Sequence, residues 1–201
     1  MDSLRMLHQQ LETVNIRFHH VARSVTPELM VASVAPGANP IGFLLWHMAR
    51  TQDWGINTVV RGIPEVIRQP RWADTPLSAV LGTGTGFGAQ DVHTIAAGVE
   101  LDQLMNYADA VHHSAVDWVA RAREDDLDVM PAVDVQNAAY PEYQRREFLE
   151  ELNSGPEHNA ATEDTGGTPA WLYLTSVCVT HMHRHLGELD LTLGVLTGRA
   201  G

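Results

Sequence analysis

The chain has 201 residues, a formal net charge of −12 and 44% apolar residues, enough for a single domain over residues 1–201 with a substantial core. This acidic balance argues against nucleic acids and anionic membranes as partners, since both favour a basic surface. Every cationic residue other than histidine is arginine, which excludes a lysine Schiff base and a P-loop lysine.

The N-terminal segment is predicted to form the first helix, over residues 3–25. Apolar side chains recur there at alternating steps of three and four, which is typical of a helix that packs in a bundle. These positions are Leu4, Leu7, Leu11, Val14, Phe18, Val21 and Val25. No apolar run has membrane-span length, and residues 1–5 lack a signal-peptide pattern, so we expect a cytoplasmic protein.

A second helix is predicted over residues 39–61. Asn39 provides a cap for this helix, and Pro40 suits its first turn. His47 lies near the middle of this helix, within an otherwise apolar stretch. A polar residue at such a position is a candidate for a functional role.

A long Gly-rich loop is predicted after the second helix, over residues 62–97. Its stretch Gly82–Gly88 superficially looks like a phosphate cradle, but it has no lysine, and no clear strand precedes it. We therefore interpret this stretch as a flexible connection near a pocket. Residues 89–94 are compatible with the start of a short helix.

Two further helices complete the predicted architecture. The third spans residues 99–123 and carries His112 on its inner stripe. Residues 124–167 form an acidic insertion, in which 141–152 suits a short helix. The last helix spans residues 168–197. The sequence thus predicts an all-α four-helix bundle.

The last helix carries the strongest chemical signal. Its predicted inner stripe consists of Trp171, Leu174, Cys178, His181, His185, Glu188, Leu191 and Val195. Histidines four apart point about 40° apart, so His181 and His185 can hold one ion, whereas His183 points about 200° away. Buried polar groups need partners, and a metal ion supplies one for both imidazoles. A third ligand must come from another helix, and His47 is the best candidate.

Other side chains compete for a role at this site. Cys178 is within reach of the metal on helical geometry, although a buried apolar role suits it better. We predict Glu188 and His112 as catalytic residues. Glu188 would orient a ligand histidine or act as a base, and His112 is a general base, a fourth ligand or a core residue. A zinc-peptidase HExxH motif is excluded because Met182 follows His181.

Two segments resemble signatures of the DinB/YfiT-like family. Residues 46–54, with the sequence WHMARTQDW, are similar to the signature of the family's second helix. Residues 181–189 contain the pattern HxxxHxGEL, which resembles the signature of its last helix. Trp72 and Gly82–Gly88 are similar to one branch of the family. The resemblance covers most of the chain except residues 124–167.

The resemblance implies an up-down-down-up four-helix bundle, frequently dimeric, with a three-histidine metal site. Its ligands match His47, His181 and His185 of this chain. We expect a divalent ion, zinc or nickel first and iron as the alternative, because imidazole suits all three. Related members include S-transferases that use bacillithiol or mycothiol, and a mycothiol-dependent maleylpyruvate isomerase. The isomerase branch is less similar, because it commonly has an acidic ligand at the position of His181.

Three functional hypotheses follow from these expectations. The first is a homodimeric, metal-dependent transferase that joins a low-molecular-weight thiol cosubstrate to an electrophilic small molecule. The second is a hydrolase that uses the same ion to activate water. The third is a non-catalytic metal-binding, small-molecule-binding or interaction protein whose partner surface is the acidic insertion. The sequence does not separate them, because they differ in what fills the open position on the metal.

Overall fold

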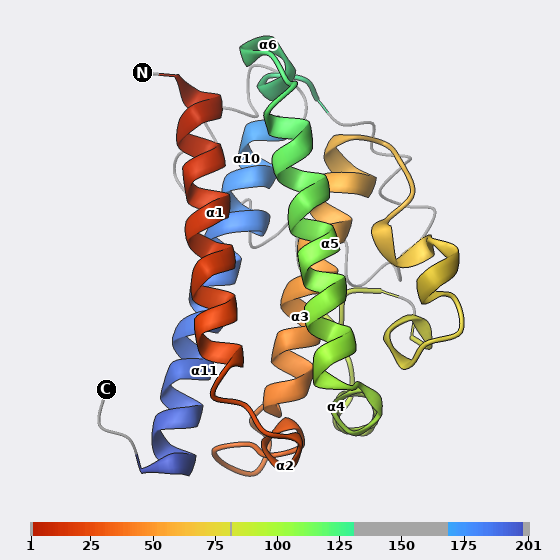
Figure 1. Ribbon diagram of the computed structural model, residues 1–201, viewed down its shortest axis with the longest axis vertical. Coiled ribbons are helices and arrows are strands. Elements are labelled where there is room, and N and C mark those ends of the chain that lie inside the picture. Colours follow the sequence, from red (N-terminus) through yellow and green to blue (C-terminus); the bar gives the residue numbers. More distant parts are fainter. Residues whose placement is uncertain (1, 81, 131–168, 199–201) are drawn as a thin grey trace.

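The computed structural model describes residues 2–80, 82–130 and 169–198, and this part of the chain is helical and contains no strand (Figure 1). The long helices are α1 (Ser3–Ala22), α3 (Ile41–Asp53), α5 (Leu101–Val119) and α11 (His181–Thr197). The π-helical segment η1 (Trp54–Val60) continues α3, and the π-helical segment η5 (Ser176–Thr180) joins α10 (Ala170–Thr175) to α11. The shorter helices are α2 (Pro27–Met30), α4 (Ala89–Gly98) and α6 (Glu124–Leu127).

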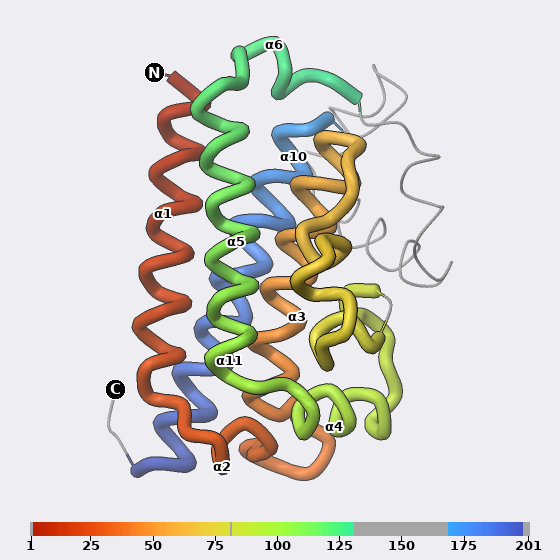
Figure 2. Tube along the Cα trace, turned by 45° about the vertical axis from the view of Figure 1, so that its right-hand side comes forward, coloured from red at the N-terminus to blue at the C-terminus, as the bar shows by residue number. Residues whose placement is uncertain are grey.

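The long helices pack side by side as a bundle. In Figures 1 and 2, α1 runs down from the N-terminus, α3 and α5 both run up, and α10 leads down into α11. Helix α1 contacts α5 and α11, and α3 contacts the same two helices. The all-α fold class and the up-down-down-up order are therefore confirmed. Among the described helices, none combines the length and hydropathy that crossing a lipid bilayer requires.

The core follows the periodicity of α1 closely. Six of the seven predicted positions, from Leu7 to Val25, are buried, and Leu4 is packed against their edge. Helix α3 differs, because all of its residues from Ile41 to Asp53 are buried. It has neighbours on every side, since it contacts α2, α4, α5, α11 and η5. This position explains why both polar and apolar side chains of α3 are removed from solvent.

The segment predicted as a long Gly-rich loop contains short helical elements that pack against the bundle. It contains three 3₁₀ turns, η2 (Val66–Arg68), η3 (Pro70–Trp72) and η4 (Pro76–Ser78), and then α4. Figure 2 shows this segment, in yellow and light green, beside α3. Helix α4 confirms the short helix expected from residue 89.

Asp53 is the side chain that fixes the start of this segment. Its carboxylate accepts hydrogen bonds from the backbone N–H groups of Val66, over 2.8 Å, and Ile67, over 3.0 Å. It also accepts from the Tyr107 hydroxyl over 2.7 Å and from the Asn57 amide over 2.7 Å. Asp53 is fully buried, so these bonds replace the water that a carboxylate otherwise needs. Burial raises the pKa of Asp53.

Arg50 is buried beside Asp53 and extends the same network. Its Nη1 atom lies 2.6 Å from Oε2 of Glu65 and donates to the Tyr107 hydroxyl over 3.1 Å. Its Nε donates to the carbonyl oxygen of Gly82 over 3.2 Å. A buried guanidinium is stable only with such partners. The result is a bond between α3 and the Gly-rich stretch.

The predicted stripe of the last helix is correct in its middle and wrong at its ends. Trp171, Leu191 and Val195 are exposed at 36%, 65% and 58%, whereas His185 is buried. Each step of three residues falls about 60° short of a full turn, so two such steps beyond His185 rotate the stripe into solvent. The π-helical η5 also changes the helical phase before His181.

The acidic insertion predicted over residues 124–167 is described only as far as residue 130. Its first part forms α6, where Glu124 accepts hydrogen bonds from the backbone N–H groups of Ser3, over 2.9 Å, and Leu4, over 3.4 Å. Glu124 thus supplies an acceptor to the free N–H groups at the start of α1. The helix predicted over residues 141–152 lies outside the described residues.

Candidate metal centre

Three histidines converge between α3 and the start of α11. The Nε2 atoms of His47 and His185 each lie 3.1 Å from Nε2 of His181. Within the described residues, these three form the group of histidine, cysteine and carboxylate side chains whose ligand atoms all lie within 4.8 Å of one another. The three histidines predicted as ligands are therefore close enough to bind one metal ion.

The orientation of His47 is set by the backbone of the Gly-rich stretch. Its Nδ1 atom lies 2.6 Å from the carbonyl oxygen of Thr83, which can only accept a hydrogen bond. The hydrogen of a neutral imidazole is therefore on Nδ1, and Nε2 presents a lone pair to the other histidines. The ring also stacks on Phe43, with the two planes 4° apart.

His185 is oriented in the same way by Glu188. Its Nδ1 atom lies 2.9 Å from Oε2 of Glu188, one turn later on α11. A carboxylate accepts this hydrogen bond, so Nε2 of His185 also presents a lone pair. A carboxylate behind a ligand histidine is a recurrent arrangement at metal sites, where it fixes the ring and raises its basicity.

The three imidazoles share few hydrogen atoms where their Nε2 atoms converge. Two of the three converging Nε2 atoms carry lone pairs, so among the three imidazoles only that of His181 can place a hydrogen between them, while Nη2 of Arg184 lies 3.4 Å from Nε2 of His185. The Nδ1 atom of His181 is buried without a hydrogen-bond partner. Either tautomer of His181 therefore leaves a polar atom unsatisfied, which is costly in a buried site. A cation that accepts the three Nε2 lone pairs would give these nitrogens a partner, with the hydrogen of His181 on Nδ1.

The spacing of the nitrogens also fits a metal ion. Zinc binds imidazole nitrogen at about 2.0–2.1 Å in tetrahedral geometry, which places neighbouring ligand nitrogens about 3.3 Å apart. The two Nε2 distances to His181 are both 3.1 Å. Three protein ligands would leave one tetrahedral position open, as in catalytic sites. The residues present thus fit a divalent ion.

The electrostatics of the site keep His47 and His181 neutral. Burial lowers the pKa of His47 to about 4 and that of His181 to about 2, and neighbouring imidazoles act in the same direction. Both side chains are therefore able to donate lone pairs at neutral pH. Burial raises the pKa of Glu188, while Arg184 opposes that shift.

The structure separates the other predicted residues from the triad. His183 lies outside the cluster, as predicted, and its Nδ1 is 3.3 Å from Nη1 of Arg17 on α1. His112 on α5 places its Nε2 3.3 Å from Glu12 Oε1 on α1, so its catalytic role stays a prediction. Cys178 is buried in η5 outside the triad, and burial raises the pKa of its thiol to about 12.

The residues that orient His47 were not foreseen from the sequence as part of the site. Gly84 has φ +101°, and a Cβ atom there would lie 2.9 Å from both Phe43 Cζ and Trp46 Cζ3. Only glycine permits this conformation and this close approach. Gly84 therefore lets the Gly-rich stretch lie against α3, where Thr83 meets His47. Gly84 is therefore a positioning element for His47.

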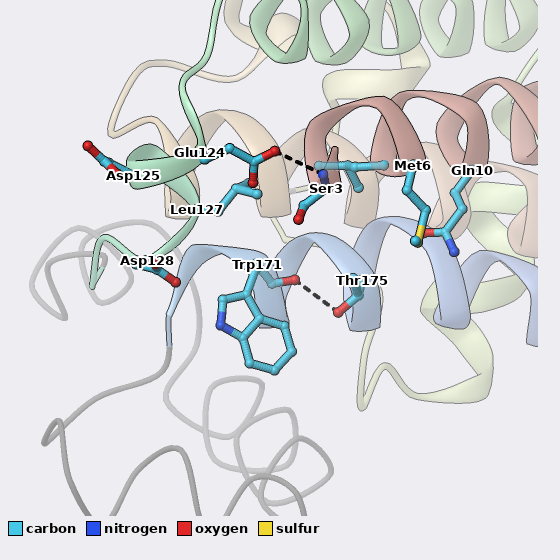
Figure 3. A pocket seen from close by; sticks show the side chains of 10 residues that line it. Ser3, Met6, Gln10, Glu124, Asp125, Leu127, Asp128, Trp171 and Thr175 are labelled. Atoms are coloured by element: carbon cyan, nitrogen blue, oxygen red, sulfur yellow. Dashed lines mark hydrogen bonds between the residues drawn. The ribbon is translucent and has the colours of Figure 1, made fainter. Parts of the chain in front are cut away.

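A separate cavity of about 360 Å³ lies between α1, α6 and α10 (Figure 3). Its lining combines apolar and acidic side chains: Ser3, Met6, Leu7, Gln10, Glu124, Asp125, Leu127, Asp128, Trp171 and Thr175. None of these residues is a histidine or a member of the triad. This cavity is therefore separate from the histidine triad.

Comparison with known proteins identifies a family and a shared fold. The family model for the DinB superfamily matches residues 10–189. A solved structure described as a conserved protein from Enterococcus faecalis shares the fold, with a TM-score of 0.69 and 15% sequence identity, over 99% of each chain. No curated protein matches the sequence. At this identity the solved structure shows the shared fold alone.

Proposed function

The chain belongs to the DinB superfamily, and from this premise we propose that it is a metal-dependent transferase that joins a low-molecular-weight thiol to an electrophilic small molecule. The observation that carries the proposal is the triad of His47, His181 and His185, whose Nε2 atoms converge closely enough for one divalent ion to accept their lone pairs. A cytoplasmic homodimer is part of the same proposal.

The three imidazoles are the groups that would hold the ion, and zinc or nickel suits them best, with iron as the alternative. All three ligands are neutral, so a bound divalent ion would keep its charge and lower the pKa of a thiol at the open position. Thr83 and Glu188 hold His47 and His185 in the tautomer that such binding needs.

Glu188 is the carboxylate best placed to accept a proton. It lies beside His185, it is partly exposed, and burial raises its pKa, which makes it a stronger base than a free carboxylate. In the proposed reaction the thiol gives up its proton and its sulfur forms a bond to the electrophilic carbon. The leaving group departs with the electron pair of the bond that breaks.

The experiment starts with elemental analysis of the purified protein and continues with zinc-loaded, nickel-loaded and metal-free samples. Each sample is mixed with bacillithiol, mycothiol or a simple thiol and with a model electrophile, and thiol consumption is followed. We expect consumption only with metal, and its loss in His181→Ala. Metal-loaded protein that consumes no thiol with any electrophile would overturn the proposal, and turnover of esters instead of thiols would favour a hydrolase.

A further inference from the structure

The cavity between α1, α6 and α10 takes no part in the proposed reaction (Figure 3). Its volume of about 360 Å³ is that of a site for a small molecule, since ligand pockets usually measure about 300–1,000 Å³. Two apolar side chains of its lining, Met6 on α1 and Trp171 on α10, are 46% and 36% exposed. A ligand with an apolar part would therefore gain free energy by leaving water to cover them.

The charged side chains of this cavity are all acidic. They are Glu124, Asp125 and Asp128. Among the described residues that line the cavity, none is an arginine or a histidine. Arg123 is adjacent to them in the chain, but its Nη2 atom lies 3.9 Å from Asp126, which is not part of the lining. The cavity therefore presents negative charge beside its apolar surface.

We infer that this cavity binds a small organic cation, in which an ammonium group is attached to an apolar body. The charge of the lining selects the sign of the ligand, and Met6 and Trp171 select its apolar part. The inference goes beyond the proposed function and does not depend on the metal, because the cavity and the triad have no residue in common.

The spacing of the carboxylates favours an organic cation over a metal ion. A metal site needs several ligand atoms close to one another. Within residues 2–80, 82–130 and 169–198, the histidine triad is the group that brings three such atoms within 4.8 Å of one another, and it contains no carboxylate. The acidic side chains of the cavity are too widely spaced for a divalent ion, whereas an extended organic molecule can contact them and the apolar surface together.

The arrangement around Trp171 suits an ammonium group. In Figure 3 the indole ring of Trp171 lies between the side chains of Asp128 and Thr175. A cation is attracted both to the face of an indole ring and to a carboxylate. The Thr175 hydroxyl donates its hydrogen to the carbonyl oxygen of Trp171 over 2.9 Å, so its oxygen keeps a lone pair as a further acceptor. An ammonium group has three hydrogens to donate and needs such acceptors.

The test uses three probes of similar shape and different charge on the full-length, metal-free protein at pH 7. They are 2-phenylethylamine, 2-phenylethanol and 3-phenylpropanoate, which are a cation, a neutral molecule and an anion. The readout is the NMR signal of the Trp171 indole N–H group, which is assigned by its absence from Trp171→Leu. Titration of this signal gives the dissociation constant of each probe, and no turnover is needed.

Three variants identify the groups that bind the amine. Asp128→Asn removes the carboxylate beside Trp171 and keeps its shape. Its control is Asp117→Asn, which also removes one carboxylate, but on α5 outside the cavity, where Asp117 is 70% exposed. Met6→Gln removes part of the apolar surface. The signals of the other indole groups show whether each variant is folded.

We expect the wild type to bind the amine roughly ten-fold more tightly than the alcohol, and the carboxylate probe most weakly. Asp128→Asn should weaken binding of the amine roughly three-fold and leave binding of the alcohol unchanged. Asp117→Asn should bind all three probes as the wild type does. Met6→Gln should weaken the amine and the alcohol alike, because it removes apolar contact rather than charge.

Three outcomes would overturn the inference. The first is a Trp171 signal that does not respond to the amine, or that responds equally to the amine and the alcohol. The second is equal affinity of Asp128→Asn and Asp117→Asn for the amine, which would mean that the overall charge of the protein attracts it. The third is a response that disappears in His181→Ala, because the amine would then bind at the triad. None of these outcomes affects the proposed thiol reaction, which is measured separately.

Discussion

Nδ1 of His47 and the carbonyl oxygen of Thr83 lie 2.6 Å apart, so a histidine in the middle of α3 takes its orientation from the backbone of the Gly-rich stretch. The bond determines which nitrogen of His47 is free for the metal. Arg50 strengthens the arrangement, because it donates to the carbonyl of Gly82, the residue before Thr83. The candidate site therefore includes a loop as well as two helices.

Gly84→Ala should destabilise the protein by about 2–4 kcal/mol and weaken metal binding. The new methyl group meets Phe43 and Trp46 at 2.9 Å, and the positive φ adds backbone strain. The displaced stretch then moves Thr83 away from His47. Chemical denaturation and a metal titration measure the two effects.

Gly62→Ala is the matched control for this prediction. Gly62 also has a positive φ, +61°, but a Cβ atom there meets nothing within 4 Å. We expect a loss of about 1 kcal/mol from strain alone, with unchanged metal affinity. Similar losses of metal affinity in both variants would contradict the positioning role of the Gly-rich stretch.

His181→Ala should lower metal affinity by at least about a hundred-fold, whereas His183→Ala should leave it nearly unchanged. His181 contributes the Nε2 atom that lies 3.1 Å from each of the other two, and His183 instead contacts Arg17. Loss of a ligand affects affinity more than loss of a supporting residue, which costs 10- to 100-fold. Competition with a chelator of known affinity measures both variants, and equal losses would refute the assignment of faces on α11.

The histidine triad was predictable from the sequence because its members are polar residues at positions where a helix should be apolar. His181 and His185 share a face at a spacing of four, and His47 interrupts an apolar stretch. Both patterns depend only on neighbouring residues, so a small error in the predicted helical phase does not change them. The same local reasoning assigned His183 to another face, as the structure confirms.

The surroundings of the triad were not predictable, because they depend on contacts between distant parts of the chain. Thr83 and Gly84 contact α3 because the segment between α3 and α5 folds back onto it. Asp53 and Arg50 hold this segment in place through hydrogen bonds to the backbone of Val66 and Gly82. The residues of η5 do not predict a π-helical turn, since this segment contains neither glycine nor proline.

Acidification should destabilise the metal-free protein through the triad. The pKa values of His47, about 4, and His181, about 2, lie below the unfolded value of about 6.5. Below pH 6.5 the unfolded chain binds protons that the folded chain does not, so stability falls as the pH falls towards 4. Between pH 7.5 and pH 5 each of these histidines should contribute a loss on the order of 2 kcal/mol. Denaturation of the chelated protein at both pH values measures it, and an equally steep loss in His181→Ala would rule out this cause.

Arg50→Met should destabilise the protein by about 3–5 kcal/mol, because it leaves the carboxylates of Asp53 and Glu65 buried without their cation. Arg121→Met is the control, since Arg121 and its partner Asp117 are exposed at 73% and 70%, and we expect little change there.

The loss caused by Arg50→Met should also depend on pH in a direction that identifies its cause. Burial already raises the pKa of Asp53, and Arg50 opposes that shift, so removal of Arg50 raises the pKa of Asp53 further. A carboxyl whose folded pKa lies above its unfolded value binds protons preferentially in the folded state, so acidification relieves part of the cost. Comparison of Arg50→Met with the wild type at pH 8 and pH 6 by chemical denaturation should therefore give the larger difference at pH 8. A difference that does not vary with pH would mean that lost packing, rather than uncompensated charge, dominates the effect.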